Sequence, residues 1–197
     1  MLSLGPHDPL PVRPSRITVA GTSGSGKTTL ARRISAVLGA PFTEMDGLYH
    51  GPGWVPRDAF VADVTALVAQ DAWVTEWGYQ AARPLVLERA EVLVWLDLPV
   101  WTVMRQVVTR TVRRSVRREV LWNGNVEGPL WRLLRRGDGN IVDWAWTTRH
   151  ALDGLDRRLD DEAPHVVLVR LRSRAEVETW VETLADTLRQ GRDPEQS

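Results

Sequence analysis

The stretch Gly21-Thr22-Ser23-Gly24-Ser25-Gly26-Lys27-Thr28 fits the pattern G-x-x-x-x-G-K-[ST], which is typical of a phosphate-binding P-loop. Its glycines let the backbone turn so that successive N–H groups point into an anion-binding nest. A lysine ammonium then reaches the outer phosphates of a nucleotide, and a threonine hydroxyl can bind Mg²⁺. We therefore expect ATP and Mg²⁺ as cofactors. The residues expected to bind them are Gly21, Thr22, Ser23, Gly24, Ser25, Gly26, Lys27, Thr28 and Thr29.

The sequence on either side of this loop has the pattern that phosphate binding requires. Residues 17–20 form a short apolar run typical of a buried strand, and residues 28–38 carry apolar side chains at helical spacing. The order strand, loop, helix places the positive end of a helix dipole at the phosphates. Lys27 is also the only lysine in the chain. Arginine cannot replace a compact ammonium inside a phosphate nest, so this context favours a functional loop over a chance glycine turn.

Composition narrows the class of protein. A chain of 197 residues with 43% hydrophobic residues is long enough for one domain with a full core. Its formal net charge of zero provides no overall field to attract nucleic acid or a membrane. The absence of cysteine excludes disulfides and thiol catalysis and fits a cytoplasmic protein. No apolar run is long enough to span a bilayer, and we expect a monomer or a dimer.

Strand and helix patterns alternate along the whole chain, which predicts an α/β fold with a parallel sheet and helices on both faces. The strands are expected at residues 16–20, 41–46, 73–76, 92–97 and 165–171. The helices are expected at residues 28–38, 58–70, 81–89, 99–118, 130–136, 141–159 and 173–189. Residues 1–15 read as a flexible proline-rich leader, residues 16–190 as a single domain, and residues 191–197 as a disordered tail.

Three acidic residues end predicted strands and therefore belong to one edge of the sheet, where ligands bind in such folds. Asp46 can accept a proton from a substrate hydroxyl or bind it, although it can also simply stabilise the following turn. Glu76 can hold Mg²⁺, or it can be an ordinary surface carboxylate. Asp97 precedes a proline that opens the long helix, and helix capping explains it slightly better than catalysis does.

The predicted helix at residues 99–118 has an apolar face and an arginine face. The arginine face can supply positive charge to a transferred phosphate, or it can be a solvated surface or a groove for nucleic-acid phosphates. We expect one to three of its side chains to touch the nucleotide. Its members are Arg110, Arg113, Arg114, Arg117 and Arg118.

Five segments carry a resemblance to a known family: GTSGSGKTTLARRI (21–34), MDGLYHGPGWVPRDAF (45–60), WVTEWGY (73–79), VLVWLDLP (92–99) and LWNGN (121–125). The chain resembles the P-loop kinases, among them adenylate kinase and shikimate kinase. More closely, it resembles the adenylate kinase-related group often labelled DNA topology modulation proteins. The third strand of that group usually ends Asp-Gly-Asn-Tyr, whereas this chain has Glu76-Trp77-Gly78-Tyr79.

The resemblance implies a P-loop NTPase fold whose five strands have the order 2-3-1-4-5. It also implies a mobile arginine-bearing lid after the fourth strand, at about residues 105–140, and an adenine-contacting loop at Arg172. The expected activity is ATP-dependent phosphoryl transfer to a small-molecule acceptor. Its expected catalytic residues are Lys27, Asp46, Arg110, Arg113 and Arg114, with Thr28 and Glu76 at the metal.

A second function class is compatible with the same residues. A nucleotide-binding regulatory NTPase, associated with nucleic acid and having little kinase activity, would also use the P-loop and the basic helix. The zero net charge and the acidic residues at the strand ends favour the enzyme. No helix-turn-helix or zinc-finger pattern is visible, so nucleic acid is not the expected partner.

Overall fold

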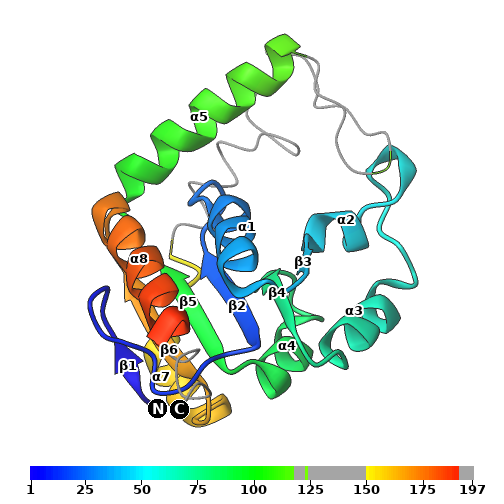
Figure 1. Ribbon diagram of the computed structural model, residues 1–197. Helices are drawn as coiled ribbons and strands as arrows, with labels where there is room; N and C mark the ends of the chain where they lie inside the picture. Colours follow the sequence, from blue (N-terminus) through cyan, green and yellow to red (C-terminus); the bar gives the residue numbers. More distant parts are fainter. Residues whose placement is uncertain (118–122, 124–149, 191–197) are drawn as a thin grey trace.

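The computed structural model describes residues 1–117, 123 and 150–190. Six parallel strands form one sheet with the order β1-β6-β5-β2-β4-β3. The strands are β1 (Ser3–Leu4), β2 (Arg16–Gly21), β3 (Phe42–Thr43), β4 (Trp73–Glu76), β5 (Val92–Leu96) and β6 (Val167–Leu171). The five predicted strands therefore follow the expected order 2-3-1-4-5, and the P-loop strand β2 is central (Figure 1).

The sixth strand corrects the expectation of a five-stranded sheet, and it lies within the predicted leader at residues 1–15. Ser3 and Leu4 pair with β6, and the Pro6 carbonyl accepts a hydrogen bond of 3.2 Å from the Thr183 hydroxyl. Leu10 is buried in the core. The prolines of this segment suggested an extended, mobile chain, but the residues before the first proline add a strand to an edge of β6 that would otherwise expose unpaired backbone groups.

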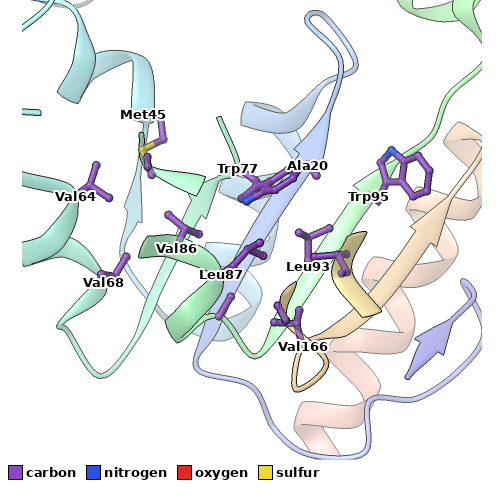
Figure 2. Close-up of a cluster of buried hydrophobic side chains, with 14 of the residues drawn as sticks. Ala20, Met45, Val64, Val68, Trp77, Val86, Leu87, Leu93, Trp95 and Val166 are labelled. Carbon is purple, nitrogen blue, oxygen red and sulfur yellow. The ribbon is translucent and has the colours of Figure 1, made fainter. Parts of the chain in front are cut away.

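Helices cover both faces of the sheet, and each face has its own core. Helices α1 (Lys27–Leu38) and α8 (Arg174–Gln190) cover one face, where Ile34 and Trp180 are fully buried. Helices α3 (Phe60–Val68), α4 (Arg83–Arg89) and α7 (Leu155–Glu162) cover the other. Figure 2 shows Val86, Leu87 and Leu93 in this second core. Successive β5 residues are buried on opposite faces, which explains why the strand is apolar throughout.

The segment after β3 differs from the predicted second strand. That strand was expected at residues 41–46, but β3 ends at Thr43 and α2 (Met45–Tyr49) begins two residues later. Asp46 consequently lies in the first turn of α2, where a carboxylate is favourable because the exposed N–H groups of a helix start carry positive charge. A 3-10 turn, η1 (Pro52–Trp54), follows.

The remaining predicted helices are reproduced with different ends where the structure describes them. Helix α5 (Val100–Arg117) begins one residue after Pro99. The helix predicted at residues 141–159 is a turn at 150–154, and α7 begins only after Gly154, whose φ of +69° is outside helical geometry. The helix predicted at 130–136 and the tail at 191–197 lie outside the described residues. Among the described helices, none has the length and apolar character needed to cross a membrane.

Candidate active site

The P-loop connects the carboxyl end of β2 to the first turn of α1 and has the geometry of an anion nest. Gly24 has φ of +80° and Gly26 has φ of +100°, a left-handed conformation that side chains with a Cβ rarely adopt. Gly26 is the N-cap of α1, so the N–H groups of the helix start line the loop. This arrangement fits the phosphates of a nucleotide.

Lys27 lies inside this loop and next to two carboxylates. Its Nζ donates to the carbonyl oxygens of Gly21 at 3.0 Å and Thr22 at 3.2 Å. Burial lowers the pKa of Lys27, while the negative charges of Glu76 and Asp46 oppose that shift. The ammonium is therefore held in place by the loop that would bind the phosphates.

Thr28 and Glu76 come together although 48 residues separate them in the sequence. The Thr28 hydroxyl donates to Oε1 of Glu76 at 2.5 Å, and Glu76 is 5% exposed. Burial raises the pKa of Glu76, and the Thr28 hydrogen bond and Lys27 act in the opposite direction. A hydroxyl and a carboxylate are the oxygen donors that Mg²⁺ prefers. In the described part of the chain, no group of three or more His, Cys, Asp or Glu side chains is placed to hold a metal ion.

Asp46 belongs to a hydrogen-bonded group that the sequence did not reveal. The Tyr79 hydroxyl donates to Oδ1 of Asp46 at 2.5 Å and lies 3.2 Å from Nε2 of His50. Burial, followed by the charge of Asp46, raises the pKa of Tyr79, so its phenol stays protonated and remains a donor. Tyr79 also stacks on Tyr49 at 4.1 Å, and Trp54 meets the His50 ring edge-on at 5.2 Å. One Asp46 oxygen is thus fixed by Tyr79.

A cleft of about 1360 Å³ joins the P-loop to these acidic residues. In Figure 1 the start of α1 lies between α5 on one side and α2 on the other. The predicted site residues that line the cleft are Gly21, Thr22, Ser23, Gly24, Gly26, Lys27, Thr28, Thr29, Asp46, Glu76, Arg110 and Arg113. Ser25 is buried and does not line the cleft, although its backbone N–H closes the loop onto the Thr22 carbonyl at 3.1 Å.

Helix α5 brings its arginines to the cleft by packing on the P-loop. Val107 is fully buried, and its Cγ2 fills the space that a side chain at Gly24 would occupy. With its amide oriented to satisfy both groups, Gln106 donates to the Gly24 carbonyl at 2.7 Å and accepts from Nη2 of Arg174 at 3.1 Å. Arg110 is close enough to Lys27 to lower the pKa of that lysine.

Parts of the expected lid fall outside the described residues. Arg114 lies in α5, but its side chain is outside the described set, as is that of Arg117, and Arg118 is not described at all. Of the lid residues beyond α5, only Asn123 is described, and its Nδ2 donates to the His50 carbonyl at 2.5 Å.

Arg172 and Asp97 occupy positions outside the cleft lining. Arg172 is exposed, and its backbone N–H donates to Glu176 at 2.7 Å. Arg174, two residues later, lines the cleft instead. Asp97 accepts hydrogen bonds of 2.9 and 2.7 Å from Arg170, so its carboxylate joins the ends of β5 and β6. Neither catalysis nor helix capping is needed to explain this aspartate.

The cleft is also lined by residues that sequence patterns did not single out as site residues, among them Trp77, Arg83, Gln106 and Arg174. Arg83 and Trp77 follow the carboxyl end of β4, which was the one available signal, because ligands in parallel sheets gather at strand ends. Arg174 likewise follows the carboxyl end of β6, but the packing of α8 decides that it, and not Arg172, lines the cleft. Gln106 carries no such signal, since its position depends on how α5 packs.

Comparison with solved structures identifies the fold. Shikimate kinase from Acinetobacter baumannii, solved with shikimate, matches with a TM-score of 0.52 and 18% identity over 92% of this chain and 96% of that one. The chain has the fold of the P-loop kinases. Gluconokinase from Sinorhizobium meliloti gives a TM-score of 0.50 with 19% identity over 93% and 99% of the two chains. Deoxyadenosine kinase from M. mycoides gives a TM-score of 0.51 with 13% identity over 89% and 98% of the two chains.

Sequence comparison adds one partial match. The ATP-dependent protease ATPase subunit HslU of Borreliella burgdorferi is 35% identical over 83 residues. This match spans 41% of the present chain and 18% of the HslU chain. No protein-family model matches the sequence.

Proposed function

We propose that this protein is an ATP- and Mg²⁺-dependent kinase that transfers the terminal phosphoryl group to a hydroxyl of a small-molecule acceptor. One observation carries the proposal: Lys27, the Thr28–Glu76 pair and Asp46 all face one cleft of about 1360 Å³. A volume of that size accommodates a nucleotide together with an acceptor. A nucleotide-binding loop alone would not need Asp46 in the same cleft.

The nucleotide side of the cleft is formed by the P-loop. Its N–H groups and Lys27 would bind the phosphates, and Thr28 and Glu76 would hold Mg²⁺ between them. The donor set fits that ion because both ligands are oxygen atoms. When bound, Mg²⁺ would neutralise phosphate charge.

The acceptor side is formed by Asp46 and the side chains that hold it. Tyr79 occupies Oδ1 of Asp46, which leaves Oδ2 to accept a hydrogen bond from the acceptor hydroxyl. As the hydroxyl oxygen bonds to the terminal phosphorus and ADP departs, Asp46 would take up the hydroxyl proton. Positioning and charge neutralisation carry most of the rate enhancement in phosphoryl transfer, so a single well-placed carboxylate suffices here.

The arginines of α5 complete the proposed machinery. Arg110 and Arg113 line the cleft on the wall next to the P-loop and would balance charge that develops on the transferred group. Arg114 is retained as a third candidate from the sequence. Arg172 also stays a candidate for the adenine end of the nucleotide.

The fold relatives suggest the first acceptors to test, because their names include shikimate, gluconate and deoxyadenosine, all of which carry hydroxyl groups. We also propose that the protein is related to the adenylate kinase-related group labelled DNA topology modulation proteins. We propose in addition that it is cytoplasmic.

The test is to incubate the protein with Mg²⁺-ATP and a metabolite extract and to search by mass spectrometry for phosphorylated products that depend on both. Shikimate, gluconate and deoxyadenosine are then assayed singly. Lys27→Ala serves as the control, with circular dichroism to verify its fold. We expect a phosphorylated product with the parent chain and none with Lys27→Ala.

Two results would contradict the proposal. Equal ATP binding and turnover by Lys27→Ala and the parent would show that the P-loop is not the nucleotide site. Hydrolysis of ATP without any phosphorylated product would favour the regulatory NTPase.

A further inference from the structure

Two hydrogen-bond donors in the cleft wall lack acceptors within the part of the chain that the structure describes. The Nε of Arg83 and the indole Nε1 of Trp77 are both buried and have no hydrogen-bond partner there, although both residues line the cleft. The guanidinium of Arg83 lies over the Trp77 ring, 4.6 Å from its centroid. A buried donor without an acceptor is unfavourable, so such a donor points to a ligand or a water molecule that accepts its hydrogen bond.

The charge of Arg83 is also uncompensated among residues 1–117, 123 and 150–190. Within the described residues no carboxylate forms an ion pair with Arg83, and the charged neighbour that most affects it is Arg158, another cation. Burial and Arg158 together lower the pKa of Arg83. In contrast, Arg16 pairs with Glu91 at 2.7 Å and Arg170 pairs with Asp97 at 2.7 Å. Arg83 therefore differs from arginines that merely join parts of the fold.

Arg83 is attached to the same short turn as the residue that fixes Asp46. The backbone N–H groups of Ala82 and Arg83 donate to the Tyr79 carbonyl at 3.0 and 3.2 Å. Tyr79 has φ of +52°, and its hydroxyl reaches Asp46 from that turn. The same turn thus carries Tyr79, which orients the Asp46 carboxylate, and Arg83, whose positive charge attracts an anion.

We propose that the phosphoryl acceptor carries an anionic group, a carboxylate or a phosphate, which binds Arg83 and Trp77 while its hydroxyl faces Asp46. This inference rests on the proposed kinase function, because it describes the acceptor of that reaction. A guanidinium can donate two parallel hydrogen bonds to either anion, which gives orientation as well as affinity. The indole N–H adds a third donor.

Binding measurements test this independently of turnover. Shikimate and gluconate are the carboxylate probes, and deoxyadenosine monophosphate is the phosphate probe. Their uncharged counterparts are shikimate methyl ester, glucose and deoxyadenosine. Affinities are measured by calorimetry with Mg²⁺-ADP present, so that the P-loop is occupied. The variants are Arg83→Ala, Trp77→Phe, which keeps the ring but removes the donor, and Arg89→Ala as the control from the exposed end of α4.

We expect at least one anionic probe to bind, and its uncharged counterpart to bind at least about tenfold more weakly. Arg83→Ala should lower the affinity for the anionic probe by about tenfold to a hundredfold without changing the affinity for Mg²⁺-ADP. Trp77→Phe should lower the affinity for the probe by less, and Arg89→Ala should bind the probe as the parent does. Preference between the carboxylate and phosphate probes identifies the anion.

Two outcomes would overturn the inference: no affinity for any anionic probe, or an anionic probe that binds Arg83→Ala as well as it binds the parent. Failure of the kinase proposal is distinguishable from this. If an anionic probe binds through Arg83 but is never phosphorylated, the proposed anion site stands and the proposed kinase reaction does not.

Discussion

Val107 of α5 occupies the space next to Gly24 in which a side chain on the P-loop would lie. Its Cγ2 would collide with a Cβ built at Gly24, and the Val103 carbonyl is 3.6 Å from the same point. The loop that would bind phosphate and the helix that carries Arg110 and Arg113 are therefore in direct van der Waals contact. A change in the loop backbone must be accommodated by α5, because closely packed groups have no space to absorb it.

This contact predicts that Gly24→Ala damages both stability and nucleotide binding. Gly39 provides the matched control, since it has φ of +71° but open space around its Cβ position. Gly39→Ala should cost only the strain of a left-handed residue, about 1–2 kcal/mol in the free energy of unfolding. Gly24→Ala should cost about 1–3 kcal/mol more because of the collision.

Denaturant unfolding and ATP titration measure the two effects. Val107→Ala in the Gly24→Ala background should recover part of the stability, because it removes the colliding methyl group. The strain of the left-handed backbone at residue 24 would remain. Equal losses for Gly24→Ala and Gly39→Ala would mean that α5 does not constrain the loop.

Removal of an α5 arginine should affect turnover more than ATP affinity. Within this arginine face, the charge of Arg110 lowers the pKa of Lys27, so Arg110→Ala is the most informative change. We expect turnover to fall by about a hundredfold or more, by analogy with arginine fingers, and ATP affinity to change much less. Arg113→Ala should follow the same pattern. Steady-state kinetics and ATP titration on the same samples separate the two quantities.

Arg117→Ala, farther along α5, is the comparison variant and should have the smaller effect. Unchanged turnover in Arg110→Ala, Arg113→Ala and Arg114→Ala would show that this face is solvated surface. The catalytic cation would then have to come from elsewhere, and the next place to look would be the cluster Arg132, Arg135 and Arg136, which lies outside the described residues.

Glu76 should make Mg²⁺ binding sensitive to mild acid. Burial raises the pKa of Glu76, so its carboxylate is lost at a higher pH than that of an exposed glutamate. Mg²⁺ binding needs the ionised form and should weaken as pH falls through this raised pKa. Glu76→Gln should bind Mg²⁺ weakly at every pH, and Glu88→Gln, an exposed glutamate of α4, should behave as the parent does. Mg²⁺ titrations of the nucleotide complex across pH measure the effect.

The same pKa shift has a stability consequence in the metal-free protein. An acid whose pKa is raised by folding favours the folded state fully below its unfolded-state pKa, and that contribution is lost as pH rises through the folded-state pKa. Glu76→Gln removes this component. The difference in unfolding free energy between Glu76→Gln and the parent should therefore shift in favour of the variant as pH rises, whereas a pH-independent difference would contradict the assignment.

Nucleic acid should bind weakly and only at low salt. The chain has no net charge, and neutralisation of DNA phosphates by a few arginines releases counterions whose benefit falls steeply with salt. Fluorescence anisotropy with duplexes of several lengths should show weak, length-dependent binding that is undetectable at physiological salt. A sequence-specific complex that persists there, with no acceptor found, would favour the regulatory function.

The sequence predicted the parts of the fold that depend on local pattern. Residues 92–96 are continuously apolar, residues 17–20 are largely so, and the P-loop motif fixes the start of α1. The strand order followed from the family resemblance. The boundary at Met45 was missed because a short apolar run with a terminal acid suits a strand as well as a helix start.

The candidate site was predicted where a motif or a strand end marks a residue, as at Lys27, Thr28 and Glu76. The contacts of Tyr79 with Asp46 and of Gln106 with Gly24 were not predictable, because each depends on the relative placement of two distant elements. Arg172 and Arg174 show the same limit. Both follow β6, but only the packing of α8 decides which of them lines the cleft.

The strand at Ser3–Leu4 has a practical consequence for anyone who produces this protein. Trimming the proline-rich segment as if it were dispensable would uncover the backbone of β6 along its outer edge, and an uncovered edge recruits strands from other molecules. Shortened chains should then self-associate as concentration rises. Affinity tags are better attached after residue 190 than spliced in place of the first fifteen residues, so that the border of the sheet stays closed.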